Sequence, residues 1–167
     1  MLVLPLLRQR WPAARLHVVG RSPTPAVLAL AGPHVNVTGT VPDVRPYLQH
    51  AAAVVAPLRV ARGIQNKILE AMAMEQPVVT VSGCADVIGA DETRGLLRAD
   101  DPPAMVTAIS GLLDDRARRA ALGRAARAHV EQHFSWQAQL SGIDAWLERA
   151  PLSQPVGATV ARVVAHG

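Results

Sequence analysis

Residues 52–81 of the chain read AAVVAPLRVARGIQNKILEAMAMEQPVVTV, and this stretch decides the fold. A short apolar run leads into a loop with proline and glycine, then into a segment with apolar residues at helical spacing, then into a second apolar run. The pattern predicts a helix with Ile68, Leu69 and Met72 facing inward between two buried strands. The predicted strands cover residues 52–56 and 77–81, the loop 57–63 and the helix 65–74. Two short apolar strands joined through a helix form a βαβ unit with parallel strands.

The same alternation of short strands and helices extends over most of the chain. It predicts further strands at residues 16–19, 35–37 and 95–97, a loop at 82–84, and helices at 2–10, 25–31, 44–50, 101–113, 114–133 and 135–149. Repeated βαβ units indicate an α/β fold, a Rossmann-like parallel sheet with helices on both faces. Residues 1–149 are expected to form one domain. Residues 150–167 lack a helical or strand period and are expected to be a disordered tail.

Composition excludes several classes of protein. Half of the 167 residues are apolar, and no apolar stretch approaches the roughly 18–20 residues that span a bilayer. The opening residues lack the charged lead-in and cleavage site of a signal peptide. The single cysteine, Cys84, excludes an internal disulfide and fits a reducing compartment. We therefore expect a cytoplasmic protein, with at most a peripheral contact with the membrane.

The net charge of +4 does not indicate a nucleic-acid interface. Lys67 is the one lysine, the arginines are scattered, and aromatic residues make up 3% of the chain, whereas nucleic-acid binding favours a basic stripe with interleaved aromatics. The histidines show no metal-ligand spacing, and Asp86, Asp91 and Glu92 do not form a metal loop. Cys84 is expected to be a buried, inert thiol. No metal site and no partner nucleic acid are expected.

The predicted loop and helix start at residues 57–67 carry the residues that indicate chemistry. Ligands of open parallel sheets bind at the carboxyl ends of the strands. There, Arg59, Arg62 and Gly63 precede the first helical turn with Asn66 and Lys67. Unpaired N–H groups and the dipole of a helix start favour anions, glycine permits close backbone approach, and the cations add charge. A diphosphate fits these groups.

Glu70 lies one turn deeper, where a carboxylate suits a vicinal diol rather than a phosphate. A ligand with phosphate groups at the helix start and a diol one turn further along the helix would be a nucleotide. Two simpler interpretations remain open at this point. Glu70 is either a solvated side chain, or it forms an ordinary i,i+3 ion pair with Lys67. Two other loops, at residues 20–24 and 39–43, also follow predicted strands and are weaker candidates.

The segment from Gly63 to Val79 resembles the hallmark of retaining GT-B glycosyltransferases of family 4, which carry a Glu-rich loop, Leu-Glu-Ala-Met-Ala, a turn and Pro-Val-Val. The Gly-Ile-Gln-Asn-Lys wording at residues 63–67 is similar to a bacterial subgroup linked to exopolysaccharide assembly. Further resemblances follow in the family's order at residues 16–20, 35–42, 52–57 and 134–136. The resemblance thus covers about residues 4–147, the C-terminal, donor-binding half of the GT-B fold.

The resemblance implies roles for individual residues. Glu70 corresponds to the second glutamate of the family's Glu-x7-Glu motif and would hold the nucleotide ribose. Gly63 and Ile64 would contact the diphosphate and sugar, with Asn66 and Lys67 beside them. The loop residues Gly39, Thr40 and Val41 would lie against the nucleobase. Arg62 stands where the family has its first glutamate, which touches the donor sugar, and this departure implies either a different donor sugar or reduced activity.

The resemblance also implies what the chain would work with. Family members carry an acceptor-binding domain and a first strand before the region matched here, so we expect an N-terminally truncated domain that is inactive alone. The full enzyme would transfer a hexose from a UDP- or GDP-sugar to a polysaccharide or lipid-linked acceptor, with retention and without an obligatory metal. No catalytic residue is assigned. The alternatives are a non-catalytic nucleotide-sugar-binding fragment and a GT-B-fold nucleotide-sugar epimerase.

Overall fold

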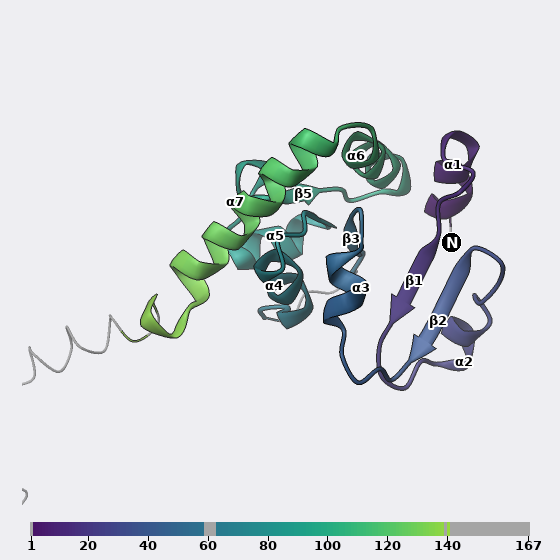
Figure 1. The fold of residues 1–167 in the computed structure, drawn as a ribbon, viewed down its shortest axis with the longest axis horizontal. Helices are drawn as coiled ribbons and strands as arrows, with labels where there is room; N and C mark the ends of the chain where they lie inside the picture. The colour runs from purple at the N-terminus through teal and green to yellow at the C-terminus, as the bar shows by residue number, and fades with distance from the viewer. Residues whose placement is uncertain (1, 59–62, 139, 141–167) are drawn as a thin grey trace, which may run out of the picture.

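The computed structural model describes residues 2–58, 63–138 and 140, and the chain within these ranges is an α/β protein (Figure 1). Its strands are β1 (Leu16–Val19), β2 (Val35–Gly39), β3 (Val54–Ala56), β4 (Val78–Thr80) and β5 (Leu96–Arg98). Its helices are α1 (Val3–Arg10), α2 (Pro25–Leu28), α3 (Arg45–Gln49), α4 (Asn66–Ala73), α5 (Ser82–Ile88), the 3-10 helix η1 (Glu92–Arg94), α6 (Pro102–Asp114) and α7 (Arg116–Phe134). The predicted alternation of strands and helices is confirmed.

The strands pair in parallel, but in two sheets rather than the one expected. β1 pairs with β2, and β3, β4 and β5 pair in that order. A doubly wound sheet has the order 3-2-1-4-5-6, in which the first strand separates the second from the fourth. If β1 to β5 are strands two to six of that order, the break between the sheets falls at the position of the first strand. The absence of that strand from the chain stays a prediction.

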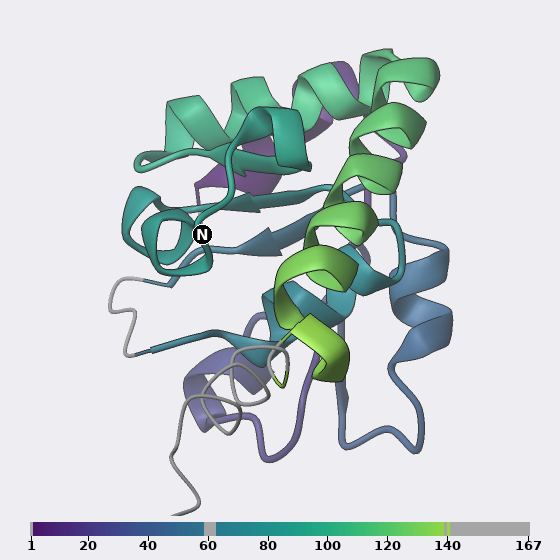
Figure 2. The same cartoon turned by 90° about the vertical axis from the view of Figure 1, so that its left-hand side faces the viewer.

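The three-stranded sheet is buried on both faces. Along β4, Val78 packs into a cluster with Ile68 and Met72 of α4, whereas Val79 packs into a second cluster with Ile109 and Leu112 of α6. Neighbouring residues of a strand point to opposite faces, so each face receives one of the two valines. Figure 2 shows α6 lying over the strands, and α1 packs beside α6. The expected cover of helices on both faces is confirmed for this sheet.

Local signals fix the ends of the long helices. Asp101 caps α6 by accepting a hydrogen bond from Ala104 N at 2.7 Å, and Asp115 caps α7 by accepting one from Arg118 N at 2.8 Å. Such caps satisfy backbone donors that have no partner inside the helix. Ser135 likewise accepts a hydrogen bond from Ala138 N at 3.2 Å, as its predicted capping role requires. The rest of the helix predicted to residue 149 and the tail at residues 150–167 lie outside the described residues.

One predicted loop is wrong. Residues 82–84 begin α5 (Ser82–Ile88) instead of forming a loop. Cys84 and Ile88, four residues apart, are both buried against the sheet, and Gly89 ends the helix in the left-handed conformation with φ of +66°. Burial of this apolar face outweighs the poor helix propensity of the opening Ser-Gly pair. Cys84 is buried, as predicted, at 1% exposure.

Helix α7 packs closely against the end of α4 and against the segment between η1 and β5, and each of these two contacts requires a glycine. A Cβ atom at Gly123 of α7 would lie 2.0 Å from the backbone oxygen of Glu75, just after α4. A Cβ atom at Gly95 would lie 2.3 Å from the backbone oxygen of Leu122, and Gly95 also has φ of +75°. Only residues without a Cβ fit such approaches. The position of α4, which carries Glu70, therefore depends on glycine in α7.

Candidate nucleotide site

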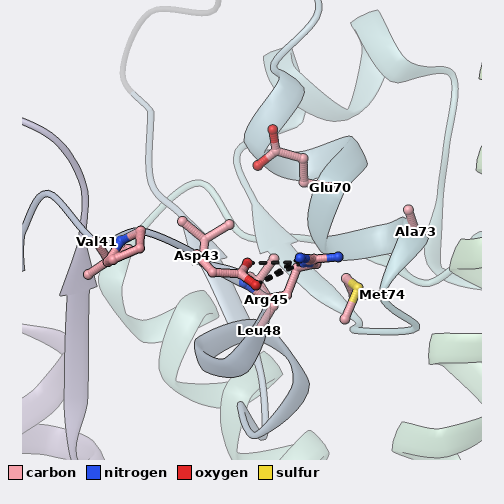
Figure 3. A pocket seen from close by; sticks show the side chains of 9 residues that line it. Val41, Asp43, Arg45, Leu48, Glu70, Ala73 and Met74 are labelled. Atoms are coloured by element: carbon pink, nitrogen blue, oxygen red, sulfur yellow. Dashed lines mark hydrogen bonds and ion pairs between the residues drawn. The ribbon is translucent and has the colours of Figure 1, made fainter.

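Glu70 lines a pocket formed by α4, the loop after β2 and α3 (Figure 3). The pocket has a volume of about 460 Å³, within the range of roughly 300–1,000 Å³ that ligand sites usually occupy. Its lining consists of Val41, Pro42, Asp43, Val44, Arg45, Leu48, Glu70, Ala73 and Met74. A carboxylate, an ion pair and several apolar side chains therefore converge on one hollow.

The period of α4 explains why Glu70 faces the pocket. Ile68, Ala71 and Met72 are fully buried against the sheet, which leaves the opposite face of the helix to Glu70 and to Ala73 and Met74. Residues three and four apart share a helix face, so these three lie together along the pocket wall. The predicted inward orientation of Ile68 and Met72 is confirmed, and Leu69 is partly buried against the same core.

Among the residues that the structure describes, none occupies the carboxylate of Glu70. It makes no hydrogen bond or ion pair within residues 2–58, 63–138 and 140. The simpler interpretation, an ion pair between Lys67 and Glu70, is thus not formed in that part of the chain. A carboxylate with open acceptor sites at the wall of a pocket can accept two hydroxyl hydrogen bonds, as a ribose diol requires.

An ion pair of Asp43 and Arg45 lies across the pocket from Glu70 (Figure 3). Arg45 Nε donates to both carboxylate oxygens at 3.0 Å, its terminal nitrogen lies 2.9 Å from Oδ2, and its backbone N–H donates to Oδ1 at 2.9 Å. These hydrogen bonds from the guanidinium, then that from the backbone, lower the pKa of Asp43 below its usual value. The carboxylate is therefore a charged acceptor at neutral pH.

The loop predicted to lie against the nucleobase reaches this pocket through Val41. Gly39 ends β2 with φ of +68°, a left-handed conformation that favours glycine, and the space where its side chain would be is open. Thr40 follows as an exposed residue, and Val41 lines the pocket directly. The turn at Gly39 thus brings the chain from the sheet to the pocket wall.

The predicted diphosphate-binding residues lie at the start of α4. Gly63 has φ of +68° with open space beside it, and Gln65, which precedes the helix, donates from its side chain to the Gly63 carbonyl at 3.3 Å. Ile64, Asn66 and Lys67 are exposed. The first N–H groups of a helix lack partners within it and can meet an anion. Arg62, like Arg59, lies outside the described residues.

The pocket also holds four residues that were not predicted from the sequence to line it, namely Asp43, Arg45, Leu48 and Met74. Asp43 is the last residue of the loop at residues 39–43, which the sequence indicated only as a weaker candidate. The sequence feature that could have identified it is an aspartate two residues before Arg45, where a short helix begins. Met74 follows from the helical period, since it lies four residues after Glu70. Leu48 gave no usable signal, because a leucine on a short helix usually belongs to a core.

Two hydrogen-bond connections hold the carboxyl ends of the central strands together. Thr80 Oγ1, fully buried, donates to the Ala56 carbonyl at 2.8 Å. Asp100, beyond the end of β5, accepts hydrogen bonds from Ser82 N at 2.7 Å and from Ser82 Oγ at 2.6 Å. These bonds stabilise the edge of the sheet from which the loop before α4 emerges.

The part of the chain that the structure describes holds a buried histidine but no cluster of metal ligands. Within it, no three His, Cys, Asp or Glu side chains gather as metal ligands would. His129 is buried in α7, where its Nε2–H donates to the Ile88 carbonyl at 3.2 Å, which is a structural role. None of the described helices is long and apolar enough to cross a membrane.

Comparison with solved structures defines the fold as that of GT-B glycosyltransferases. A crystal structure of TarM superposes with a TM-score of 0.73 at 21% identity, covering 87% of this chain and 30% of TarM. HepE from Anabaena, crystallised with UDP and glucose, superposes with a TM-score of 0.71 at 19% identity, covering 89% of this chain and 44% of HepE. Sucrose-phosphate synthase from Thermosynechococcus elongatus superposes with a TM-score of 0.70 at 25% identity, covering 87% of this chain and 41% of the synthase.

The family follows from the sequence match. Residues 2–115 match the family Glycosyl transferases group 1, and the chain belongs to this family. A lipopolysaccharide core biosynthesis mannosyltransferase, LpcC, from Rhizobium leguminosarum bv. viciae is 33% identical over 109 residues, which is 64% of this chain and 31% of the relative.

A GDP-mannose-dependent phosphatidylinositol monomannoside mannosyltransferase from Corynebacterium glutamicum is 40% identical over 76 residues, 45% of this chain and 20% of the relative. The chain thus spans less than a third of the length of these curated relatives. The resemblance to GT-B glycosyltransferases of group 1, seen in residues 63–79, is confirmed by the family match.

Proposed function

We propose that residues 1–149 bind the nucleoside-diphosphate sugar of a retaining hexosyltransferase, and that the Glu70 carboxylate accepts hydrogen bonds from the ribose hydroxyls. The observation that carries the proposal is the carboxylate of Glu70, which has no partner among the described residues and lies on the wall of a pocket of about 460 Å³, one turn beyond the start of a helix. In this arrangement Gly63, Ile64, Asn66 and Lys67 face the diphosphate. Gly39, Thr40 and Val41 lie on the side of the base.

Catalysis by such a domain is chiefly orientation and charge stabilisation. Glu70 and the loop hold the donor in one orientation. Much of the translational and rotational entropy that the reaction requires to be lost is then already lost when the donor binds. The N–H groups and Lys67 stabilise the negative charge that develops on the departing diphosphate. We propose that this charge is met without an obligatory metal ion, and that Arg62 contacts the donor sugar where relatives carry glutamate. That replacement would change the choice of sugar or lower the rate.

The acceptor belongs to the remainder of the enzyme. The relatives' names refer to lipopolysaccharide core and to a phosphatidylinositol monomannoside, which supports a polysaccharide or lipid-linked acceptor and a hexose as the transferred group. We propose that an acceptor-binding domain precedes the donor domain, and that the first strand of the donor sheet pairs between β1 and β3. We also propose that the enzyme acts in the cytoplasm, at the face of the membrane, in the assembly of exopolysaccharide or a related glycan.

A thermal-shift experiment tests the proposal. The 167-residue chain is heated with and without UDP, GDP, ADP and TDP, alongside the variant Glu70→Gln and the matched control Glu131→Gln, which removes the same charge from α7. A nucleotide bound at 100 times its Kd adds about 2.7 kcal/mol to stability. We expect stabilisation of the chain and of Glu131→Gln that is lost in Glu70→Gln. Equal stabilisation of both variants would contradict the role of Glu70.

Turnover separates transfer from mere binding. A radiolabelled nucleotide sugar is incubated with the full-length enzyme and a lipid-linked acceptor. Label is expected in the acceptor, whereas release of an isomerised sugar without acceptor would indicate an epimerase. Binding without either product would indicate a non-catalytic module.

A further inference from the structure

The charge of the chain is unevenly distributed along its length. Of the 17 basic residues, four lie within residues 1–42, which contain no acidic residue and carry the whole net charge of +4. Residues 43–167 contain the other 13 basic residues and all 13 acidic ones, so their charges balance. The four basic residues of the first part are Arg8, Arg10, Arg15 and Arg21. Such asymmetry favours attraction of residues 1–42 to an anionic surface.

The fold places much of this basic part at one end of the molecule. The sheet of β1 and β2, with α2, lies at one end of the long axis, and the end of α7 lies at the other (Figure 1). In the part of the chain that the structure describes, Arg10 pairs with Asp114 at 2.7 Å, whereas Arg8, Arg15 and Arg21 make no ion pair. Arg15 and Arg21, on either side of β1, are both exposed. Their charge is therefore not neutralised by a neighbouring carboxylate.

An exposed apolar segment belongs to the same part of the chain. Residues 25–33, PAVLALAGP, form α2 and the turn after it and contain no polar side chain. Eight of these nine residues are exposed, and Val27 is half-buried. Leu28 is 50% exposed and Leu30 39%. A continuous run of exposed apolar side chains marks a surface that contacts a membrane or another molecule.

We propose that residues 25–33, together with the arginines of the same end of the molecule, dock onto an anionic lipid bilayer. The inference rests on the proposed action of the enzyme at the face of the membrane, and it names the surface that makes the contact. Leu28 and Leu30 enter the boundary between headgroups and acyl chains, while Arg21 is attracted to the negatively charged headgroups.

The backbone of the apolar segment is suited to this environment. Apolar lipid offers no hydrogen-bond partner, so a segment that enters it must satisfy its own backbone groups. Each backbone N–H from Val27 to Gly32 donates to a carbonyl within residues 24–35, at 2.9–3.1 Å. Six consecutive donors are thus satisfied without water. The segment can leave water at little cost in lost hydrogen bonds.

The chemistry of the segment favours lipid over a protein or a nucleic acid. Protein interfaces carry polar groups and about one hydrogen bond per 100–200 Å², but residues 25–33 have no polar side chain to contribute. They also have no aromatic side chain on which a base could stack. Docking to a bilayer requires neither, because it depends on buried apolar area and on the attraction of cations to anionic lipids.

Co-sedimentation of the 167-residue chain with lipid vesicles tests the inference. One set of vesicles is phosphatidylcholine alone, and the other contains equal parts of phosphatidylcholine and phosphatidylserine. The variants are the double substitution Leu28→Ser with Leu30→Ser, which removes apolar area, and Arg21→Gln, which removes one charge. The matched controls are Val87→Ser in α5, where the side chain is 43% exposed, and Arg124→Gln at an exposed position of α7.

We expect at least tenfold tighter binding to the anionic vesicles than to the neutral ones, and weaker binding at high salt. The double variant should bind at least about tenfold more weakly, because each leucine loses apolar area that the bilayer would bury. Arg21→Gln should bind about fivefold more weakly, and both controls should bind as the original chain does. Circular dichroism checks the fold of each variant. If the double variant does not fold, the comparison of Arg21→Gln with Arg124→Gln decides.

Several results would overturn the inference. They are equal binding to neutral and anionic vesicles, no binding of the original chain, and losses in the controls as large as those in the variants. A dimer in light scattering that the double variant separates would place a second copy on residues 25–33. Loss of vesicle binding in the full-length enzyme would place another domain there.

The proposed function fails separately. Absence of vesicle binding with nucleotide stabilisation intact overturns the docking surface alone. Vesicle binding without stabilisation by any nucleotide overturns the nucleotide site alone.

Discussion

Gly123 of α7 is the residue whose replacement tests most sharply how the fold positions Glu70. An alanine Cβ at this position would lie 2.0 Å from the backbone oxygen and 2.9 Å from the backbone carbon of Glu75, at the end of α4. Cβ contacts under 3.0 Å are essentially never seen, so α7 and α4 would have to separate by about 1 Å. The obstacle is backbone on both sides, and no side chain can rotate away to relieve it.

The magnitude follows from two opposing terms. Overpacking in a close contact costs about 1–3 kcal/mol, and alanine in place of glycine within a helix gains about 1 kcal/mol. We expect Gly123→Ala to lower the free energy of unfolding by up to about 2 kcal/mol, which corresponds to a fall in Tm of up to about 8 °C for a chain of this length. Because α4 moves with the contact, nucleotide binding through Glu70 should weaken as well.

The matched control is Gly111→Ala in α6. The nearest atom to its Cβ is Arg118 Nη1 at 3.0 Å, the far end of a flexible side chain, so the helix-propensity gain should dominate. Urea unfolding followed by circular dichroism compares the two variants with the original chain. If Gly123→Ala is as stable as Gly111→Ala, the close packing of α7 on α4 is not as the structure has it.

Three further predictions concern charge and pH. Hydrogen bonds from the hydroxyl and then the backbone N–H of Ser82 lower the pKa of Asp100. The ionised carboxylate therefore stabilises the fold above about pH 4, and this stabilisation is lost as the pH falls further. In thermal melts, Asp100→Asn should lower the Tm at pH 7 and reduce the difference between the Tm at pH 7 and the Tm at pH 3. Burial lowers the pKa of His129, so the unfolded chain binds a proton at this side chain more readily than the folded chain does. The free energy of unfolding should therefore decline below about pH 6.5. If urea unfolding shows the same decline with pH in His129→Gln, this explanation is contradicted. Lys67→Ala should weaken nucleoside diphosphates about two- to fivefold at low salt, less at high salt, and leave the free nucleoside unaffected in titration calorimetry.

The βαβ pattern was predictable from sequence because buried strands and amphipathic helices leave a periodic trace. The strand at residues 77–81 and the inward face at Ile68 and Met72 depend on that trace, and both agree with the structure. The pairing of strands was not predictable. Hydrogen bonds between strands leave no mark on the periodicity of either, so the division into two sheets emerged only in three dimensions. The helix at residues 82–88 was missed for a related reason, since tertiary burial of Cys84 and Ile88 decided it.

The candidate site was partly predictable. Glu70 follows from its place one turn beyond a helix start, and family resemblance singled it out. Asp43 and Arg45 come from a separate loop, and their position opposite Glu70 depends on how α3 and α4 pack, which no local pattern encodes. A surface aspartate two residues from an arginine is usually a solvated pair. Its importance is visible only once the pocket is formed.

A crystal structure of the 167-residue chain with GDP bound would test directly whether the Glu70 carboxylate forms hydrogen bonds with the ribose of the nucleotide. We expect a Glu70 carboxylate oxygen at about 2.6–3.0 Å from the ribose hydroxyls, with the diphosphate beside the backbone N–H groups at residues 63–67. A nucleotide bound elsewhere on the chain, with Glu70 still facing solvent, would contradict the assignment.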